Sequence, residues 1–233
     1  MLPAAILAGG MATRLRPITE VIPKALVDVA GKPFIFRQLD YLRRQGIKRV
    51  VLCVSYLGER VEAVVGDGSG FGMDVVYSWD GPHLLGTGGA LKQALPLLGE
   101  HFFVLYGDSY LTIDFKEVEQ AFWGSGKSAL MTVLRNADLW DKSNVLFSSG
   151  VIEEYNKLEP RTEMEHIDYG LGVLSAGVMN DLPGNEPFDL ADLYHRLSVQ
   201  GALAGHEVFE RFYEIGSLVG LKETIDYFKK GGE

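Results

Sequence analysis

The sequence predicts an α/β fold in which a mostly parallel, mixed sheet is covered by helices on both faces. In the first half of the chain, short apolar runs of strand length alternate with amphipathic segments of helical period. After about residue 125 the runs are mainly strand-like, so the second half should add β-rich elements around a pocket. We expect residues 1–233 to form one domain, because a chain of this length can bury a single large core.

The first half is expected to contain four strands separated by three helices. The strand-length apolar runs are residues 3–7, 49–54, 74–78 and 102–106. The amphipathic segments between them are residues 34–45, 59–65 and 88–98. In the first of these, Ile35, Leu39 and Leu42 fall on one helical face. Strand–helix–strand order of this kind joins parallel strands.

The second half is expected to contain more strands than helices. The predicted strands are residues 129–134, 145–147, 151–155, 171–175 and 207–213. The predicted helices are residues 190–199 and 218–228. This mixture favours a sheet whose second half is no longer purely parallel.

The overall charge argues against a nucleic-acid-binding surface. The chain carries 31 acidic and 22 basic residues, for a net charge of −9. Such a protein can still bind a nucleotide where its positive charge is concentrated locally. We therefore expect small-molecule substrates and no nucleic-acid partner.

Cysteine usage and hydropathy point to a cytoplasmic protein. Cys53 is the only cysteine and lies in the apolar run 50–54, so we expect a buried thiol rather than a nucleophile or a disulfide. The N-terminus lacks the basic region and long apolar core of a signal peptide. No apolar run approaches the length that spans a bilayer, so no membrane association is expected.

Residues 7–26 are the most informative stretch of the chain. Gly9 and Gly10 follow the first predicted strand, and paired glycines let the backbone approach a ligand and point N–H groups at it. Arg14, Arg16 and Lys24 then place positive charge where phosphates bind. Neither a Gly-x-Gly-x-x-Gly pattern nor a Gly-Lys-Ser/Thr ending is present in this loop. The stretch predicts a polyphosphate site at the end of the first strand.

An acidic residue should lie beside this loop. Asp108 follows the predicted strand 102–106, and ligands of parallel sheets bind beyond the carboxyl ends of the strands. Both segments therefore fall at the same edge of the sheet. Asp108 and the basic loop are expected to face one pocket.

These residues resemble the signature of sugar-1-phosphate nucleotidyltransferases, in which Gly-Gly-x-Gly/Ala-Thr-Arg-Leu-x-Pro precedes Pro-Lys. The similar stretches occur in the family's order, at residues 9–17, 23–24, 32–33, 85–90, 107–108 and 214–216. Within the family, the sequence is most similar to bacterial heptose and mannose 1-phosphate guanylyltransferases. The N-acetylmuramate 1-phosphate uridylyltransferases are also similar. The resemblance implies a Rossmann-like nucleotidyltransferase type A fold, here without a C-terminal β-helical domain.

The reaction of this family needs alignment and charge neutralisation more than a protein nucleophile. A sugar-phosphate oxygen attacks the α-phosphorus of a nucleoside triphosphate, and pyrophosphate leaves. The resemblance implies that Arg14 binds the departing pyrophosphate, Lys24 the α-phosphate and Lys157 the sugar phosphate. For Lys157, an ordinary surface lysine in a hairpin is the alternative.

The resemblance also implies the residues that contact the nucleotide. They are Leu7, Ala8, Gly9, Gly10, Ala12, Thr13, Gly86, Thr87 and Gly88. The first six belong to the phosphate loop, and the last three would approach the nucleobase. A plain strand–helix turn is the alternative for residues 86–89.

Two carboxylates and a sugar pocket complete the expected site. Asp108 and Glu214 are expected to hold Mg²⁺, which prefers oxygen ligands. The family usually has Asp where Glu214 stands, and a helix N-cap or turn residue is the alternative for both carboxylates. Asn156, Tyr169 and Gly170 are expected to line the sugar site, and relatives usually have Glu where Asn156 stands.

The favoured function is a Mg²⁺-dependent transfer of GMP from GTP to D-glycero-D-manno-heptose 1-phosphate or mannose 1-phosphate, for capsule or lipopolysaccharide synthesis. A uridylyltransferase acting on N-acetylmuramate 1-phosphate or another hexose 1-phosphate is the first alternative. A catalytically silent homologue that binds a nucleotide sugar is another. Retention of Arg14, Lys24 and Asp108 favours catalysis over the silent homologue.

Overall fold

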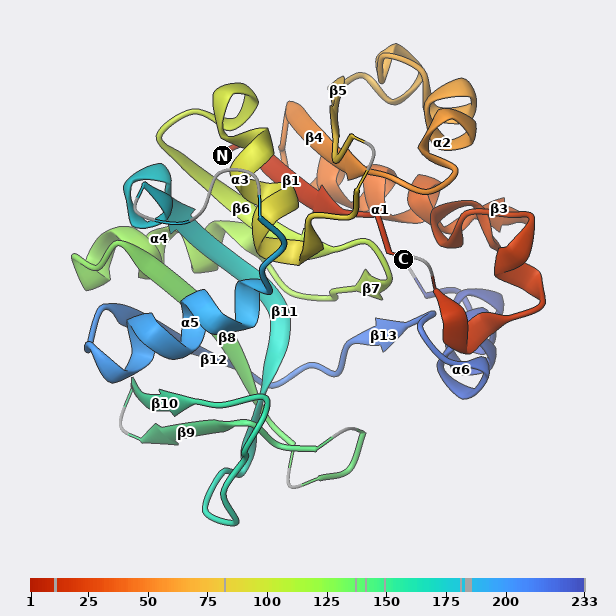
Figure 1. Ribbon diagram of the computed structural model, residues 1–233. Helices are drawn as coiled ribbons and strands as arrows, with labels where there is room; N and C mark the ends of the chain where they lie inside the picture. The colour runs from red at the N-terminus through yellow and green to blue at the C-terminus, as the bar shows by residue number, and fades with distance from the viewer. Residues whose placement is uncertain are drawn as a thin grey trace.

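A mixed sheet forms the centre of the protein (Figure 1). The computed structural model describes residues 1–10, 12–81, 83–136, 138–140, 142–148, 150–180, 182 and 186–232. Within this part of the chain, nine strands form the sheet, in the order β5-β4-β1-β6-β11-β8-β12-β10-β9. They are β1 (Ala4–Leu7), β4 (Arg49–Val54), β5 (Asp74–Trp79), β6 (His101–Tyr106), β8 (Ala129–Arg135), β9 (Val145–Ser148), β10 (Val151–Tyr155), β11 (His166–Ser175) and β12 (Leu203–Val208).

The sheet changes from parallel to mixed along its width. Strands β5, β4, β1 and β6 run parallel to one another. Strand β11 is antiparallel to both β6 and β8, whereas β12 runs parallel to β8. Strands β10 and β9 close the sheet as an antiparallel pair. The predicted fold class is therefore confirmed.

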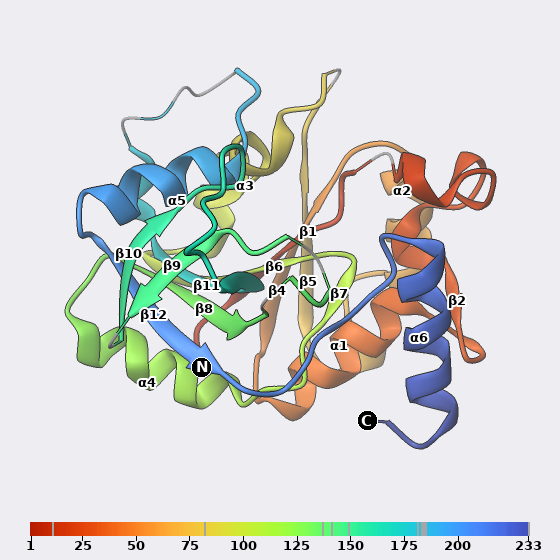
Figure 2. The same ribbon diagram turned by 90° about the horizontal axis from the view of Figure 1, so that it is seen from below.

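Helices cover both faces of the sheet (Figure 2). Helices α1 (Phe34–Arg44), α2 (Gly58–Val65) and α4 (Phe115–Ser125) bury apolar side chains in one core cluster. Helices α3 (Gly86–Leu98) and α5 (Leu190–Val199) bury theirs in a second cluster on the other face. Two separate cores on one sheet are what the alternating sequence pattern predicts.

Two small pairings and a last helix lie beside the main sheet. Strands β2 (Asp28–Val29) and β3 (Lys32–Pro33) pair with each other, as do β7 (Ser109–Tyr110) and β13 (Tyr213–Glu214). Helix α6 (Leu218–Lys229) packs Leu221 into a third apolar cluster that includes Leu15 and Tyr110. The β7–β13 pairing brings the C-terminal segment back to the end of β6. Short 3₁₀ turns are η1 (Thr13–Leu15), η2 (Ile18–Glu20), η3 (Lys24–Leu26), η4 (Ser69–Phe71) and η5 (Ala176–Met179).

The structure corrects two predicted strands and adds a helix that was not predicted. Helix α4 was not predicted, although Phe115, Val118 and Phe122 bury one helical face and the Asp114 side chain caps its first turn. The predicted strand 207–213 is wrong in extent, because β12 spans Leu203–Val208 and ends before the exposed Phe209. The predicted strand 171–175 is the second half of the longer strand β11.

Strand β11 contains an irregularity at its middle. Its register against β8 shifts between Asp168 and Gly172, and Gly170 adopts φ +103°, which side chains rarely tolerate. Thr132 of β8 donates its hydroxyl to the carbonyl of Leu171 at 2.7 Å and fixes the bulged segment. Bulges of this kind redirect side chains near functional sites.

None of the helices in the described part of the chain is long and apolar enough to cross a membrane.

Candidate active site

The loops after β1 and β6 meet at the carboxyl edge of the parallel strands. Gly107 donates its N–H to the carbonyl of Leu7 at 3.0 Å. A Cβ at Gly107 would lie 2.8 Å from that carbonyl oxygen and 2.9 Å from the Cα of Ala8, so only glycine fits there. This contact places Asp108 beside the glycine loop, as the sequence predicted.

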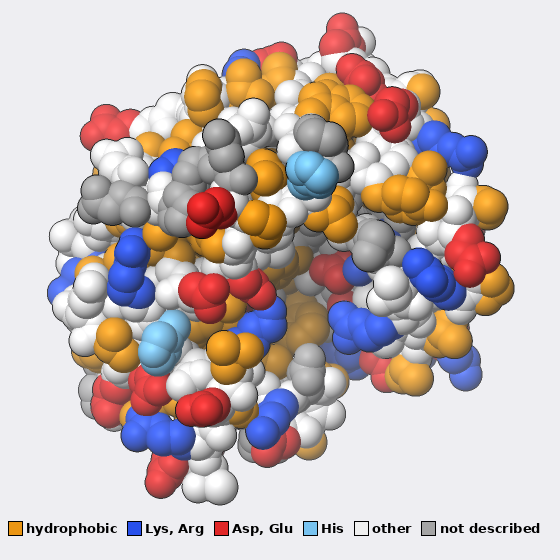
Figure 3. All heavy atoms as spheres, in the orientation of Figure 1, with side chains coloured by type: hydrophobic (Ala, Val, Ile, Leu, Met, Phe, Trp, Pro, Cys, Tyr) orange, Lys and Arg blue, Asp and Glu red, His pale blue; other side chains and the backbone are white. Residues whose placement is uncertain are grey.

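A cavity of about 250 Å³ opens between these loops and α3. Figure 3 shows the hollow near the centre of one face, with acidic and basic side chains at its edges. Of the residues predicted to bind the nucleotide or to act on its phosphates, the lining includes Leu7, Ala8, Gly9, Gly10, Lys24, Gly86, Thr87 and Asp108. The two segments that the sequence assigned to the triphosphate and to the base thus line one cavity.

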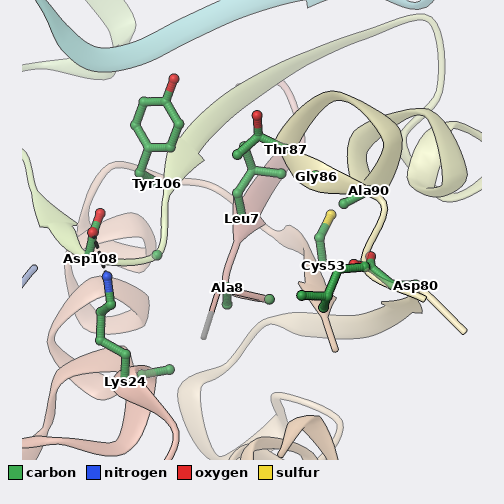
Figure 4. A pocket seen from close by; sticks show the side chains of 15 residues that line it. Leu7, Ala8, Lys24, Cys53, Asp80, Gly86, Thr87, Ala90, Tyr106 and Asp108 are labelled. Atoms are coloured by element: carbon green, nitrogen blue, oxygen red, sulfur yellow. Dashed lines mark hydrogen bonds and ion pairs between the residues drawn. The ribbon is translucent and has the colours of Figure 1, made fainter. Parts of the chain in front are cut away.

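One end of the cavity carries an ion pair between predicted site residues. Lys24 lies in η3, and its Nζ is 2.8 Å from Oδ2 of Asp108. Both side chains are largely buried, with 17% and 25% of their surface exposed. Figure 4 shows the pair at one end of the pocket, facing Ala8. A lysine and a carboxylate held this way present one positive and one oxygen-rich group to the same ligand.

Glu214 and Arg14 lie near the same end. A Cβ at Gly216 would be 2.8 Å from Oε2 of Glu214, 3.1 Å from Oδ2 of Asp108 and 3.4 Å from Nη2 of Arg14. Two carboxylates and a guanidinium therefore converge on one point. The described residues contain no group of three or more His, Cys, Asp or Glu side chains poised around a metal. Phosphate oxygens would have to complete an oxygen ligand set here.

The Glu214 carboxylate also binds the turn that leads into α6. It accepts hydrogen bonds from the backbone N–H of Gly216, from the Ser217 N–H at 3.1 Å and from the Ser217 hydroxyl at 2.6 Å. These are turn contacts, which the sequence analysis set against a metal role, whereas the hydroxyl of Ser217 caps α6. Because Oε2 still faces Asp108, these contacts orient the carboxylate toward the cavity end.

The other end of the cavity carries a carboxylate that was not predicted. Asp80 follows β5 and accepts a hydrogen bond from the Leu85 N–H at 3.2 Å. Burial raises the pKa of this carboxyl. Asp80, like Asp108, follows a parallel strand, and ligands bind beyond the carboxyl ends of such strands. The same reasoning from the sequence could therefore have identified Asp80.

Cys53 lines the cavity together with Asp80. It is buried, and burial raises the pKa of its thiol to about 12. A thiol with so high a pKa is a poor nucleophile. The prediction of a buried thiol is confirmed.

A side-chain bridge joins the predicted base loop to the predicted sugar lysine. The Thr87 hydroxyl donates to Oδ1 of Asp189 at 2.8 Å and accepts from the Leu190 N–H at 2.8 Å. Lys157 Nζ lies 3.0 Å from Oδ2 of the same Asp189, which also caps α5. Hydrogen bonds and the Lys157 ion pair hold the pKa of Asp189 below its ordinary value despite burial. No pattern in the sequence predicted that Thr87 and Lys157 share Asp189 as a partner.

Three other predicted nucleotide residues lie outside the cavity lining. Ala12 and Thr13 belong to the η1 turn, where the Ala12 carbonyl accepts from Thr19. Gly88 packs directly on the ring of Phe188, since a Cβ there would lie 2.1 Å from its Cε2. These contacts give Gly88 a packing reason to be glycine.

The predicted sugar residues fall in different surroundings. The Asn156 side chain donates to Glu154 at 3.1 Å and accepts from the Glu159 N–H at 2.9 Å, so it is engaged in its own turn. Tyr169 is only 1% exposed and lies in the core against Phe212, with its hydroxyl accepting from the Thr112 N–H. Both placements argue against direct sugar contact.

Comparisons with known proteins agree with this geometry. The family model described as nucleotidyl transferase matches residues 3–142. The chain is 30% identical over 207 residues to the D-glycero-alpha-D-manno-heptose 1-phosphate guanylyltransferase of Campylobacter jejuni, which covers 86% of this chain and 90% of that protein. It is 44% identical over 113 residues to the N-acetylmuramate alpha-1-phosphate uridylyltransferase of Neisseria meningitidis, or 48% of this chain. That match spans 49% of the Neisseria protein, about half of its length.

A solved structure has the same fold over nearly the whole chain. The crystal structure of HddC from Yersinia pseudotuberculosis aligns with a TM-score of 0.84 at 25% identity, covering 98% of this chain and all of HddC. Nucleotidyltransferases of this family generally use a divalent metal ion. The chain belongs to the nucleotidyl transferase family, and the relatives it matches are sugar-1-phosphate nucleotidyltransferases.

Proposed function

We propose that this protein transfers a nucleoside monophosphate from a nucleoside triphosphate to a sugar 1-phosphate and releases pyrophosphate. One observation carries the proposal: the Lys24–Asp108 pair closes one end of a cavity that both glycine-rich segments line. In this proposal the triphosphate lies in one cavity, between the charged side chain of Lys24 and the backbone of the glycine-rich segments.

The basic residues divide the phosphates between them in this proposal. A sugar-phosphate oxygen forms a bond to the α-phosphorus, and the bond from that phosphorus to the oxygen bridging to the β-phosphate breaks. Lys24 neutralises charge on the α-phosphate, and Arg14 binds the departing pyrophosphate through its planar guanidinium. Lys157 holds the incoming sugar phosphate once that phosphate replaces Asp189 as its partner. Lowering the charge on each phosphate reduces repulsion in the transition state.

The backbone of the first loop completes the nucleotide site. The Ala8 N–H already donates to the Cys53 carbonyl at 2.9 Å, so it is not available to a ligand. We assign backbone contacts with the nucleotide to Gly9 and Gly10, and to Gly86 at the opposite wall. Leu7 and Thr87 shape the cavity, while Ala12 and Thr13 fix the turn that presents Arg14.

Asp108 and Glu214 fit a Mg²⁺ ion, because both are hard oxygen donors that face one point beside Gly216. When bound, such an ion screens the phosphates and helps to orient them for in-line attack. Lys24 balances the charge of Asp108 through their ion pair.

For the substrates, we propose GTP and D-glycero-D-manno-heptose 1-phosphate or mannose 1-phosphate, with the product used in capsule or lipopolysaccharide synthesis in the cytoplasm. The Campylobacter guanylyltransferase, matched over most of both chains, supports this choice. Asp80 supports it as well, because a carboxylate accepts from two neighbouring N–H groups, and guanine offers such a pair on its Watson–Crick edge. Uracil offers one N–H between two carbonyl oxygens. The 44% identity to the Neisseria uridylyltransferase supports UTP as the alternative.

Pyrophosphate release across four nucleoside triphosphates tests the proposal directly. The sugar panel contains heptose, mannose, glucose and N-acetylmuramate 1-phosphates, each with Mg²⁺. We expect release with at least one pair. In Lys24→Ala, kcat should fall by about 10²–10³-fold, because the variant lacks the positive charge that neutralises the α-phosphate.

The matched control is Lys48→Ala, which removes an exposed lysine outside the cavity and should retain wild-type rates. No release with any pair would leave the chain as a nucleotide-sugar-binding homologue. Release by Lys24→Ala at the wild-type rate would refute the role of Lys24.

A further inference from the structure

Gln38 is a polar side chain on the buried face of α1. It is 2% exposed, and the other buried residues of this helix are Phe34, Ile35, Leu39 and Leu42. An apolar residue at this position of the stripe would pack into the core without burying an amide. The residues that line the cavity do not include Gln38. Its place in the core therefore points to a task for the amide group.

The amide of Gln38 reaches the turn that carries Asp108. Its Nε2 donates to the carbonyl of Tyr106 at 3.0 Å and to the carbonyl of Ser109 at 2.8 Å. These two residues flank Gly107 and Asp108, and an amide nitrogen has two hydrogens, one for each carbonyl. A single side chain thus ties together the two ends of the turn.

The oxygen of the same amide shows which way the group must point. Oε1 of Gln38 is buried, and no donor in the described part of the chain reaches it. Turning the amide over would bring Oε1 against the carbonyl oxygens of Tyr106 and Ser109, and acceptors repel one another. A buried acceptor without a donor costs free energy of folding. The turn that Gln38 holds therefore explains this residue better than the stability of the core does.

The turn is also joined to the strand that carries the second carboxylate of the site. The Asp108 carbonyl accepts from the Ile215 N–H at 2.9 Å. In the β7–β13 pairing, Ser109 lies opposite Glu214. A shift of the turn would therefore move Asp108 and disturb the register that holds Glu214 beside it.

The position of Asp108 sets the geometry of the charged end of the cavity. Its Oδ2 is 2.8 Å from Nζ of Lys24, as the dashed line in Figure 4 marks. A displacement of about 1 Å breaks a hydrogen bond of this length, and it slows a reaction that depends on alignment by about 10²-fold. The two bonds from Gln38 can therefore influence the reaction although the side chain lies outside the cavity.

We propose that Gln38 is a positioning residue for the transfer reaction, which holds the Asp108 carboxylate in place by fixing the two ends of its turn. The inference rests on the proposed function. It goes beyond that function by giving a role to a buried glutamine of α1 that contacts neither substrate. Because Gln38 acts through Asp108, its effect should disappear once the Asp108 carboxylate is removed.

The first test compares two glutamines of α1 and its C-terminal cap. Gln38→Met removes both donors at a similar side-chain volume. Gln45→Met is the matched control, because Gln45 accepts from the Phe115 N–H at 2.9 Å, away from the cavity. We expect kcat for pyrophosphate release to fall by about 10–100-fold in Gln38→Met and to stay within about twofold of wild type in Gln45→Met. The KM for the sugar phosphate should change less than about twofold in both variants.

A double-mutant cycle separates positioning from a general loss of structure. Gln38→Met is combined with Asp108→Asn, and the rate of transfer is read from single turnovers at high enzyme concentration. In the Asp108→Asn background, Gln38→Met should lower this rate by less than about threefold, against about 10–100-fold when it is the only change. A general loss of structure would lower the rate by the same factor in both backgrounds.

A binding measurement reports on Asp108 without turnover. Mn²⁺ is added as a paramagnetic probe to the enzyme and the nucleoside triphosphate that wild type binds most tightly, with no sugar phosphate present. The Kd for Mn²⁺ should rise by about 10-fold in Gln38→Met and by less than about twofold in Gln45→Met. Gln38→Asn keeps the amide but is one methylene shorter, so it cannot reach both carbonyls and should behave as Gln38→Met does.

The outcomes distinguish the two proposals. Absence of pyrophosphate release by wild type with every substrate pair overturns the proposed function. An active wild type with kcat or Mn²⁺ affinity unchanged in Gln38→Met overturns only the role of Gln38. Equal losses in Gln38→Met and Gln45→Met, or losses that multiply in the cycle, overturn it as well. If neither Gln38→Met nor Gln38→Asn folds while Gln45→Met does, Gln38 serves the core and the proposed role is wrong.

Discussion

Replacing Asp168 by Asn should change how stability depends on pH. Burial raises the pKa of this carboxyl from 3.8 to about 6 in the folded protein. Between these two values the folded state binds more protons than the unfolded state, so the contribution of Asp168 to stability falls as the pH rises. Relative to its value at pH below 3.8, the free energy of unfolding falls by about 3 kcal/mol once the pH is well above 6. About 1.4 kcal/mol of this fall occurs between pH 5 and pH 8.

The assay is urea denaturation of wild type and Asp168→Asn at several pH values from 5 to 8. We expect the difference in free energy of unfolding to shift by about 1.4 kcal/mol in favour of Asp168→Asn across this range. Asn156→Ala replaces an uncharged residue by another, so its free energy of unfolding should depend on pH in the same way as that of wild type. The reasoning would be refuted if the free energies of unfolding of wild type and Asp168→Asn changed in parallel with pH. That result would mean that Asp168 has the same pKa in the folded and unfolded states.

Four other predictions concern packing, capping, the base and the metal. Gly88→Ala should lower stability by about 1–3 kcal/mol in thermal melts, because its Cβ would lie 2.1 Å from the Phe188 ring. Ser217→Ala should cost about 1 kcal/mol in urea denaturation, since the hydroxyl caps α6 by accepting from the N–H of the third residue of the helix at 2.9 Å. Asp80→Asn should lower the ratio of kcat/KM for GTP to that for UTP by at least about 100-fold, because an amide matches the edge of uracil. Glu214→Gln should raise the Mg²⁺ concentration for half-maximal rate by about 10–100-fold, read from a metal titration.

The packing and base predictions each have a result that would contradict them. Gly124→Ala provides the packing control, because nothing lies within 4 Å of its Cβ and alanine favours a helix. Equal melting temperatures for Gly88→Ala and Gly124→Ala would contradict the contact with Phe188. An unchanged GTP preference in Asp80→Asn would assign base selection to another part of the cavity.

The parts of the fold that the sequence predicted are those fixed by local periodicity. The alternation of apolar runs and amphipathic segments was enough for the parallel half and its helices, where each run is buried on both faces. Strand β12 was misplaced because Gly205 packs closely on Phe147, with a Cβ position only 2.6 Å from that ring. Such a strand carries small residues rather than an apolar signal.

The site was predictable where it follows the ends of strands. Gly9, Lys24 and Asp108 were found because motif spacing and the sheet edge both pointed to them. The Lys157–Asp189 ion pair was not predictable, because its partners lie 32 residues apart and meet only through α5. The bulge in β11 next to Asp168 was not predictable, because its register is set by the neighbouring strand.

The α-phosphorus attack is the central claim of this account, and isotope transfer tests it most directly. The sugar 1-phosphate carries ¹⁸O in its three non-bridging phosphate oxygens, and the products are analysed by mass spectrometry. We predict that all three labels appear in the nucleotide-diphosphate sugar and none in pyrophosphate, because the sugar phosphate is the nucleophile. Labelled inorganic phosphate would show attack at the sugar carbon instead. That result would contradict the roles of Lys24 at the α-phosphate and of Lys157 at the attacking sugar phosphate.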